Sequence, residues 1–190
     1  MRVGIYSGSF NPVHIGHIAL ADYIVSQHFV DEVWLIRSPH NPLKQADGLM
    51  PDDVRQKLLG LAIEGHPGLR VSCVEDDMPR PSYTIDTLCR LRADYPDTEF
   101  YLIIGADNWL IFDRWRNWQQ ILAEFHVIVY PRPGYELPVV DSKKFPTVQV
   151  VDAPQYDISS TRIRHCLAEG LSLDGLVDQR VAEYLLTCIL

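Results

Sequence analysis

The alternation of short apolar runs with amphipathic stretches constrains the fold of this 190-residue chain more than any other feature. Six runs have the length and the β-branched content of strands. Between most of them, apolar residues recur every three or four positions, as in a helix that buries one face. Strands that alternate with helices predict a doubly wound parallel α/β sheet with helices on both faces. The predicted strands are 3–6, 33–36, 69–74, 100–104, 127–130 and 148–151.

The predicted helices follow the same order along the chain. The first carries Ile18, Ala21 and Val25, and the third begins at Thr84. We see no internal repeat, and we expect one domain over 1–190 whose C-terminal part, about 159–190, is helical. The second helix, which Pro51 and Asp52 begin, carries the apolar residues Val54, Leu58, Leu61 and Ala62. Later helices are predicted at 118–125, 161–168 and 178–188, and a loop-rich segment at 131–146.

The first predicted strand ends in a small-residue turn that suits an anion. Gly8 has no Cβ, so the backbone N–H groups of the turn can approach a phosphate closely. His14 and His17 are three residues apart at the start of the next helix and project from one face. The unpaired N–H groups and the dipole of that helix add positive potential at the same place. The pattern predicts a polyphosphate site.

Two other interpretations of the histidines stay open. Histidines at this spacing can hold a metal ion, although no Cys, Asp or Glu lies nearby in the sequence to complete a site. Alternatively, the glycine and the histidines serve only packing and capping. The combined string favours phosphate chemistry over both alternatives, and we predict no resident metal site.

Ligands of doubly wound sheets bind beyond the carboxyl ends of the strands, at the point where the strand order reverses. Polar clusters follow five of the predicted strands, so these loops should converge on one edge. The last cluster contains Ser159 and Thr161, which are natural N-cap residues, and Arg164, whose guanidinium suits phosphate oxygens. Its alternative interpretation is an ordinary capped helix. The clusters are 7–17, 37–44, 82–84, 105–108 and 158–164.

Two strings carry a family resemblance. The segment from Gly8 to His17 resembles the G-[ST]-F-x-P-x-H-x-G-H signature of the nucleotidylyltransferase superfamily, which transfers AMP or CMP to an acceptor phosphate. The segment 158–164 resembles its I-S-[SA]-T-x-[IL]-R motif. The resemblance implies a Rossmann-like fold and catalysis by His14 and His17. The implied ATP-binding residues are Gly8, Ser9, Phe10, His14, His17, Ser159, Thr161 and Arg164.

The middle of the chain looks like bacterial nicotinate-nucleotide adenylyltransferases, which join nicotinate mononucleotide to ATP. The matching segments are 82–88, 104–108 and 115–116. The resemblance implies that Asp107 binds ribose, that Thr84 and the backbone N–H of Arg116 hold the nicotinate carboxylate, and that Trp115 stacks on the pyridine. An N-cap role for Asp107 is an alternative. The implied substrate-binding residues are Lys44, Ser82, Tyr83, Thr84, Gly105, Asp107, Trp115 and Arg116.

The loop after the second strand departs from the family pattern P-P-H-[KR]. It reads Asn41-Pro42-Leu43-Lys44, so Lys44 matches but Leu43 replaces a histidine and cannot donate to a phosphate. His40, three residues earlier, could take over that contact. The sequence therefore does not decide which residues contact the acceptor phosphate.

Composition narrows the choice of partner. The formal net charge of −8 argues against non-specific binding to nucleic acid or an anionic membrane. There is no signal peptide pattern and no apolar run of about 20 residues. The four cysteines show no paired spacing and indicate free thiols in a reducing compartment. We expect a cytoplasmic protein that binds ATP, nicotinate mononucleotide and, through the ATP phosphates, Mg²⁺; the oligomeric state is open.

The mechanism expected from the resemblance is in-line displacement, since the acceptor phosphate is already an anion and no protein nucleophile is needed. Three rivals stay open. They are a related nucleotidylyltransferase acting on another acceptor such as phosphopantetheine, a non-catalytic nucleotide-binding regulator, and a structural metal-binding domain. The presence of His14, His17, Thr161 and Arg164 together disfavours the regulator.

Overall fold

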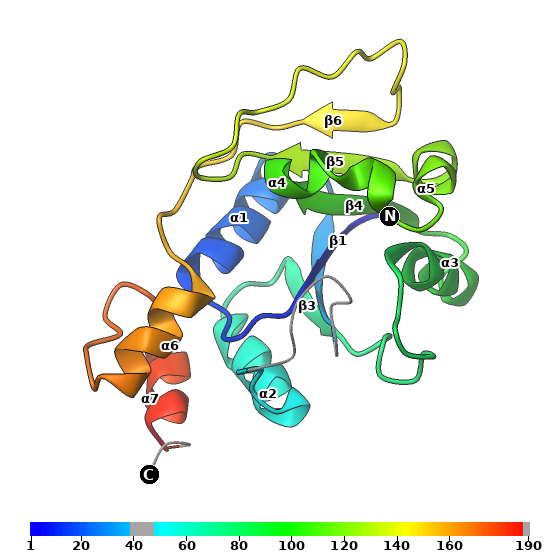
Figure 1. Ribbon diagram of the computed structural model, residues 1–190. Coiled ribbons are helices and arrows are strands. Elements are labelled where there is room, and N and C mark those ends of the chain that lie inside the picture. The colour runs from blue at the N-terminus through cyan, green and yellow to red at the C-terminus, as the bar shows by residue number, and fades with distance from the viewer. Residues whose placement is uncertain (39–47, 188–190) are drawn as a thin grey trace.

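The sheet has the predicted doubly wound arrangement. The computed structural model describes residues 1–38 and 48–187, and in it six strands pair in parallel in the order β3-β2-β1-β4-β5-β6 (Figure 1). This is the order in which a Rossmann-type sheet is wound from its centre outward. The strands are β1 Arg2–Gly8, β2 Glu32–Arg37, β3 Leu69–Ser72, β4 Glu99–Gly105, β5 His126–Tyr130 and β6 Val148–Val150.

Helices occupy the intervals between the strands as predicted, within a few residues. Two short pieces, α4 and η1, were not predicted, because three or four residues are too few to show a periodic pattern. Strand β3 ends at Ser72, two residues earlier than predicted, where its pairing with β2 ends. The helices are α1 Ile15–Ser26, α2 Asp52–Ala62, α3 Thr84–Asp94, α4 Ala106–Trp109, η1 Phe112–Arg114, α5 Trp118–Glu124, α6 Ser160–Ala168 and α7 Gln179–Thr187.

Two hydrophobic clusters lie on the two faces of the sheet. Side chains alternate along β2, so that Val33 and Leu35 join one cluster and Trp34 and Ile36 join the other. The first cluster includes buried residues of α1, α2, α6 and α7, and the second includes those of α3 and α5. Helices therefore cover both faces, which confirms the predicted fold class.

The buried face of α2 differs from the predicted one. Leu58 and Ala62 are buried as expected, whereas Val54 and Leu61 are only partly buried. In their place Leu59 and Arg55 are completely buried. Arg55 lies three, four and seven residues before Leu58, Leu59 and Ala62, which is the spacing of one helical face. The predicted face was wrong because arginine is usually exposed, so the sequence pattern assigns Arg55 to the surface.

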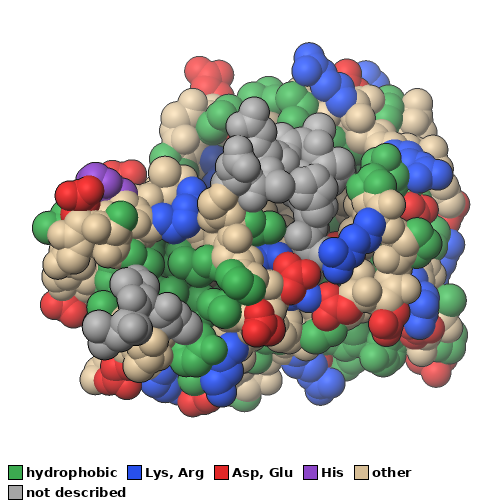
Figure 2. All heavy atoms as spheres, turned by 60° about the horizontal axis from the view of Figure 1, so that its bottom comes forward, with side chains coloured by type: hydrophobic (Ala, Val, Ile, Leu, Met, Phe, Trp, Pro, Cys, Tyr) green, Lys and Arg blue, Asp and Glu red, His purple; other side chains and the backbone are tan. Residues whose placement is uncertain are grey.

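The C-terminal helices share the core of the sheet. Ile163 of α6 and Val181 of α7 are fully buried in the same cluster as the α1 side chains. Among the described residues, no helix combines the length and the apolar character needed to traverse a bilayer. On the face shown in Figure 2, acidic and basic side chains are interspersed and do not separate into regions of one sign.

The strand order places one crevice at the centre of the sheet. Strand β1 has β2 on one side and β4 on the other, so the winding reverses between β1 and β4. Loops leave these two strands in opposite directions at their carboxyl ends, after Gly8 and Gly105. A ligand site is therefore expected above β1 and β4.

Candidate active site

The turn after β1 is built closely around an aromatic ring. A Cβ added to Gly8 would lie 3.1 Å from the ring of Phe10. Phe10 itself adopts a φ of 42° and is 3% exposed, with its ring 5.7 Å from that of Tyr6 and 5.1 Å from that of His17. The Phe10 side chain thus belongs to the core, and only its backbone is available to a nucleotide.

The two histidines form a stacked pair at the start of α1. Their ring centroids are 3.6 Å apart, and the backbone N–H of His14 donates to Nδ1 of His17 at 3.2 Å. Because Nδ1 of His17 accepts, Nε2 is the ring nitrogen that can donate. Burial, with the charge of Arg132 as a second cause, lowers the pKa of His14 to about 4. His14 is therefore uncharged at neutral pH.

Helix α6 packs its N-terminus onto the turn after β1. Ser160 donates its hydroxyl to the carbonyl of Pro12 at 2.8 Å, and Nη1 of Arg164 donates to the carbonyl of Asn11 at 2.7 Å. Nη2 of Arg164 donates to the Thr161 hydroxyl at 3.2 Å. The structure thus brings together two predicted motifs that lie about 150 residues apart. We call the turn 8–17 and the first turn of α6 the phosphate side.

Ser159 lies at the N-cap of α6. Its hydroxyl accepts the backbone N–H of Arg162 at 3.2 Å, which is the capping arrangement expected for serine at this position. The structure therefore shows the ordinary capped helix, and the start of that helix packs against the turn after β1.

The carboxyl end of β4 carries Asp107 beside an arginine that the sequence analysis did not select. Oδ1 of Asp107 is 3.5 Å from Nε of Arg132, two residues after β5. Gly105 makes room for this pair, since a Cβ there would lie 2.6 Å from Cγ of Arg132. The N-cap of α4 is Gly105 and not Asp107, which excludes the capping alternative for the carboxylate.

A second group, which we call the acceptor side, consists of 82–84 and 115–116. Tyr83 is the N-cap of α3 and Thr84 its first residue. The guanidinium of Arg116 lies 4.7 Å from the centre of the Tyr83 ring, so these two segments are adjacent. Trp115 packs at 5.2 Å on Phe112, and its indole N–H is buried without a hydrogen-bond partner in the part of the chain that the structure describes.

Ser82 is turned toward the protein interior. It is 9% exposed, and its hydroxyl donates to the buried carboxylate of Glu75 at 2.9 Å. Thr87 of α3 donates to the same carboxylate at 2.9 Å. In this arrangement Ser82 fixes the start of α3 through Glu75.

Three residues of the loop after β2, which we call the acceptor loop, lie outside the described residues. They are Lys44, which was predicted to bind substrate, Leu43 and His40.

Arg132 and Arg55 are the main polar residues that sequence reasoning missed. Arg132 follows a predicted strand, so the rule that selects Asp107 also applies to it, although it lies in the segment 131–146 that the sequence predicts to be rich in loops. Arg55 gave no signal, because it lies within an amphipathic helix where arginine is usually exposed.

Comparison with known proteins agrees with this geometry. Residues 5–166 match the family model described as cytidylyltransferase-like. A protein of Bacteroides fragilis named "Probable nicotinate-nucleotide adenylyltransferase" is 53% identical over 89% of this chain and 83% of its own length. A protein of Bacteroides thetaiotaomicron with the same name is 47% identical over 97% and 91%. This chain belongs to the nicotinate-nucleotide adenylyltransferase family.

Solved structures support the fold of this family member. Plasmodium falciparum nicotinic acid mononucleotide adenylyltransferase, solved in complex with NaAD, superposes with a TM-score of 0.81 at 19% identity. The match covers 100% of this chain and 96% of the other.

Proposed function

We propose that this chain transfers AMP from ATP to nicotinate mononucleotide, giving deamido-NAD and pyrophosphate. The observation that carries the proposal is the 2.7 Å contact between Arg164 and the Asn11 carbonyl, which joins the two nucleotide motifs at the edge where the strand order reverses. The names of the relatives that are 47–53% identical support the acceptor.

The reaction is an in-line displacement. An oxygen of the acceptor phosphate forms a bond to the α-phosphorus of ATP, the bond from that phosphorus to the bridging oxygen breaks, and pyrophosphate leaves. The protein contributes alignment and charge stabilisation.

The two histidines contribute hydrogen bonds at the start of α1. Nε2–H of His17 donates to the transferring phosphate, because Nδ1 already accepts from the His14 backbone. His14 remains uncharged at neutral pH, since its pKa is about 4. Positive charge therefore comes from Arg164, together with Lys44 of the acceptor loop. Gly8, Ser9 and Phe10 bind phosphate through the backbone, and Ser159 and Thr161 do so at the start of α6.

The acceptor side recognises the nicotinate. Thr84 lies in the first turn of α3, where helix N–H groups lack intrahelical acceptors, and it holds the carboxylate together with the backbone N–H of Arg116. In the described part of the chain neither of these N–H groups has an acceptor. Trp115 stacks on the pyridinium ring. Asp107 binds ribose above Gly105, with Tyr83 and Ser82 shaping the start of α3.

Mg²⁺ enters with ATP as part of the substrate, bound by phosphate oxygens and water. Among the residues described, no group of three His, Cys, Asp or Glu side chains is placed to hold a metal ion. A cytoplasmic location completes the proposal, supported by the free thiols of Cys73, Cys89 and Cys166.

An acceptor panel tests the function. Pyrophosphate release is followed with ATP and, in turn, nicotinate mononucleotide, phosphopantetheine and glycerol 3-phosphate. We expect turnover with nicotinate mononucleotide and formation of deamido-NAD by mass. Turnover with only one of the other acceptors would show that this compound, and not nicotinate mononucleotide, is the substrate. ATP binding without turnover on any acceptor would favour a regulator.

A further inference from the structure

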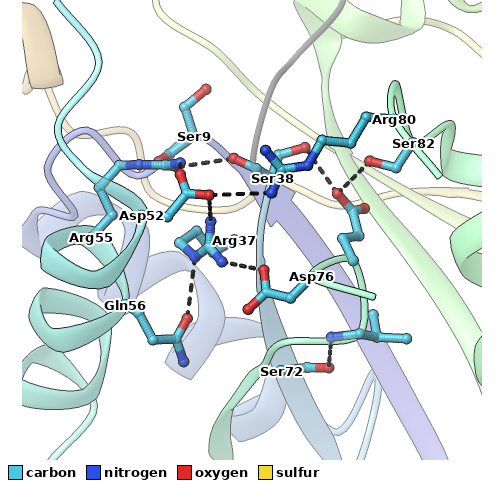
Figure 3. Close-up of polar contacts among 12 residues, drawn as sticks. Ser9, Arg37, Ser38, Asp52, Arg55, Gln56, Ser72, Asp76, Arg80 and Ser82 are labelled. Carbon is cyan, nitrogen blue, oxygen red and sulfur yellow. Dashed lines mark hydrogen bonds and ion pairs between the residues drawn. The ribbon is translucent and has the colours of Figure 1, made fainter. Parts of the chain in front are cut away.

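One buried arginine ties three segments of the chain together (Figure 3). Nη1 of Arg55 in α2 donates to the carbonyls of Ser9 at 2.6 Å and Ser38 at 2.9 Å. Its Nε donates to the Met50 carbonyl at 3.1 Å, and Nη2 pairs with the Asp52 carboxylate. The guanidinium thus links the turn after β1, the residue that follows β2 and the start of α2.

Packing alone does not account for an arginine at this position. The side chain is 0% exposed, and an apolar side chain of similar volume in place of a buried ion pair is often equally or more stable. A guanidinium supplies several donors in one fixed plane, which no apolar side chain and no lysine can do. The distinctive property of Arg55 is therefore that it fixes several carbonyls at once.

Fixing the Ser9 carbonyl also fixes a donor of the turn. The Ser9 carbonyl and the Phe10 N–H belong to one trans peptide unit, in which they point in opposite directions. With the carbonyl held by Arg55, the Phe10 N–H points away from the buried guanidinium. No described residue accepts from this N–H.

The second carbonyl connects this turn to the acceptor side. Ser38 donates its backbone N–H to the Gly8 carbonyl at 2.9 Å and its hydroxyl to Glu75 at 3.1 Å. Glu75 also accepts the hydroxyl of Ser82, at the start of α3. A continuous set of hydrogen bonds therefore runs from Ser9 through Arg55, Ser38 and Glu75 to the acceptor side.

We propose that Arg55 is a positioning residue for adenylyl transfer, which through the Ser9 carbonyl aims the Phe10 N–H at the triphosphate and through Ser38 holds the turn in register with the acceptor side. Arg55 touches no substrate and acts through the backbone of the turn. The inference rests on the proposed function for the identity of the triphosphate, and ATP binding tests it without reference to the acceptor.

The first experiment compares Arg55→Lys with Leu59→Ala. Lysine keeps the charge but cannot span three carbonyls, and Leu59→Ala removes buried volume one turn further along α2 without touching the guanidinium. For Arg55→Lys we expect kcat to fall roughly 10²-fold and the Kd of ATP alone to rise about tenfold, with the acceptor KM within about threefold. Leu59→Ala should keep all three within about threefold. Equal behaviour of the two variants would overturn the proposal.

The second experiment uses the wild-type protein and so does not depend on whether a variant folds. The backbone amide resonance of Phe10 is followed by NMR while a non-hydrolysable ATP analogue is added, with the Leu59 amide as the control. We expect the Phe10 resonance to shift and the Leu59 resonance to stay. An unchanged Phe10 resonance at saturating analogue would overturn the inference, whereas a shift in a protein that makes no deamido-NAD would sustain it and refute the proposed acceptor.

Discussion

The phosphate side and the acceptor side are held in different ways. On the phosphate side, Arg164 donates to the Asn11 carbonyl and Ser160 donates to the Pro12 carbonyl, across about 150 residues of sequence. Arg55 donates to the Ser9 carbonyl of the same turn. On the acceptor side, the two segments meet through the Arg116 guanidinium and the Tyr83 ring. Arg116 is exposed, and its Nη1 lies 3.7 Å from the Asp86 carboxylate.

Under the proposed function, this difference separates two tasks. The phosphate side holds donors rigidly against the charge that builds in the transition state, and backbone hydrogen bonds provide that rigidity. The acceptor side recognises a flat ring and its substituent with an aromatic face and two N–H groups. Substitutions on the two sides should therefore change different kinetic constants.

The largest effect should come from His17 on the phosphate side. We expect His17→Ala to lower kcat by roughly 10²- to 10⁴-fold, with a much smaller change in ATP affinity, because its hydrogen bond strengthens as charge builds on the α-phosphate. Single-turnover rates measure the step directly. His126→Ala, an exposed histidine at the start of β5, is the control. A His17 variant within a few-fold of wild type would remove this side chain from the transition state.

Substitution of Arg164 should change the KM of ATP and not the KM of the acceptor. Arg164→Ala should raise the KM of ATP roughly ten- to a hundredfold while the acceptor KM changes little, since a charge-assisted hydrogen bond is lost. The neighbouring Arg162→Ala, whose guanidinium contacts the Asp157 carbonyl, should leave both constants near wild type. Steady-state kinetics with each substrate varied in turn make the measurement. A rise confined to the acceptor KM would assign Arg164 to the other side.

Substitution of Trp115 should affect the use of the acceptor. Trp115→Ala should lower kcat/KM about tenfold for both nicotinate and nicotinamide mononucleotides, because stacking reads the ring that they share. The ratio of the two values should stay as in wild type. Trp118→Ala, which removes another tryptophan from the same cluster, serves as the control. A collapsed ratio would show that Trp115 also reads the substituent.

The smallest effect is a pH dependence of stability on the phosphate side. Folding lowers the pKa of His14 from 6.5 to about 4, so the folded protein binds fewer protons than the unfolded chain between these values. The free energy of unfolding therefore keeps its full value above pH 6.5 and decreases as the pH falls toward 4. Between pH 7.5 and 5 the decrease is about 2 kcal/mol.

Urea unfolding at these two pH values measures that loss. The His14→Asn variant, which keeps a capping residue, should lose about 2 kcal/mol less than wild type over the same range. Equal pH dependence in the two proteins would show that His14 titrates normally in the folded state.

The fold and most of the phosphate side could be read from the sequence. The strand and helix patterns are long and periodic, and the turn at Gly8 and the cap at Ser159 depend on local backbone chemistry. Their meeting followed from the rule that ligands bind at the carboxyl ends of parallel strands. These are properties that single residues and short spacings encode.

The supporting polar residues could not be read in this way. Arg55 and Glu75 take their roles from partners on other segments, and no local pattern distinguishes them from surface charges. The inward orientation of Ser82 likewise depends on Glu75, seven residues earlier. Tertiary contacts, which local sequence does not specify, decide each of these cases.

Under the proposed function, the acceptor side selects an acid over an amide. Thr84 and Arg116 offer two N–H donors, and a carboxylate accepts at both oxygens, whereas a carboxamide would oppose one donor with its own N–H₂. The mismatch should cost roughly 1.4–3 kcal/mol, or about ten- to more than a hundredfold. The most direct test is kcat/KM of the wild-type protein for nicotinate mononucleotide against nicotinamide mononucleotide at saturating ATP. We expect the acid to be favoured by at least about tenfold, and equal use of the two acceptors would show that Thr84 and Arg116 do not read the carboxylate.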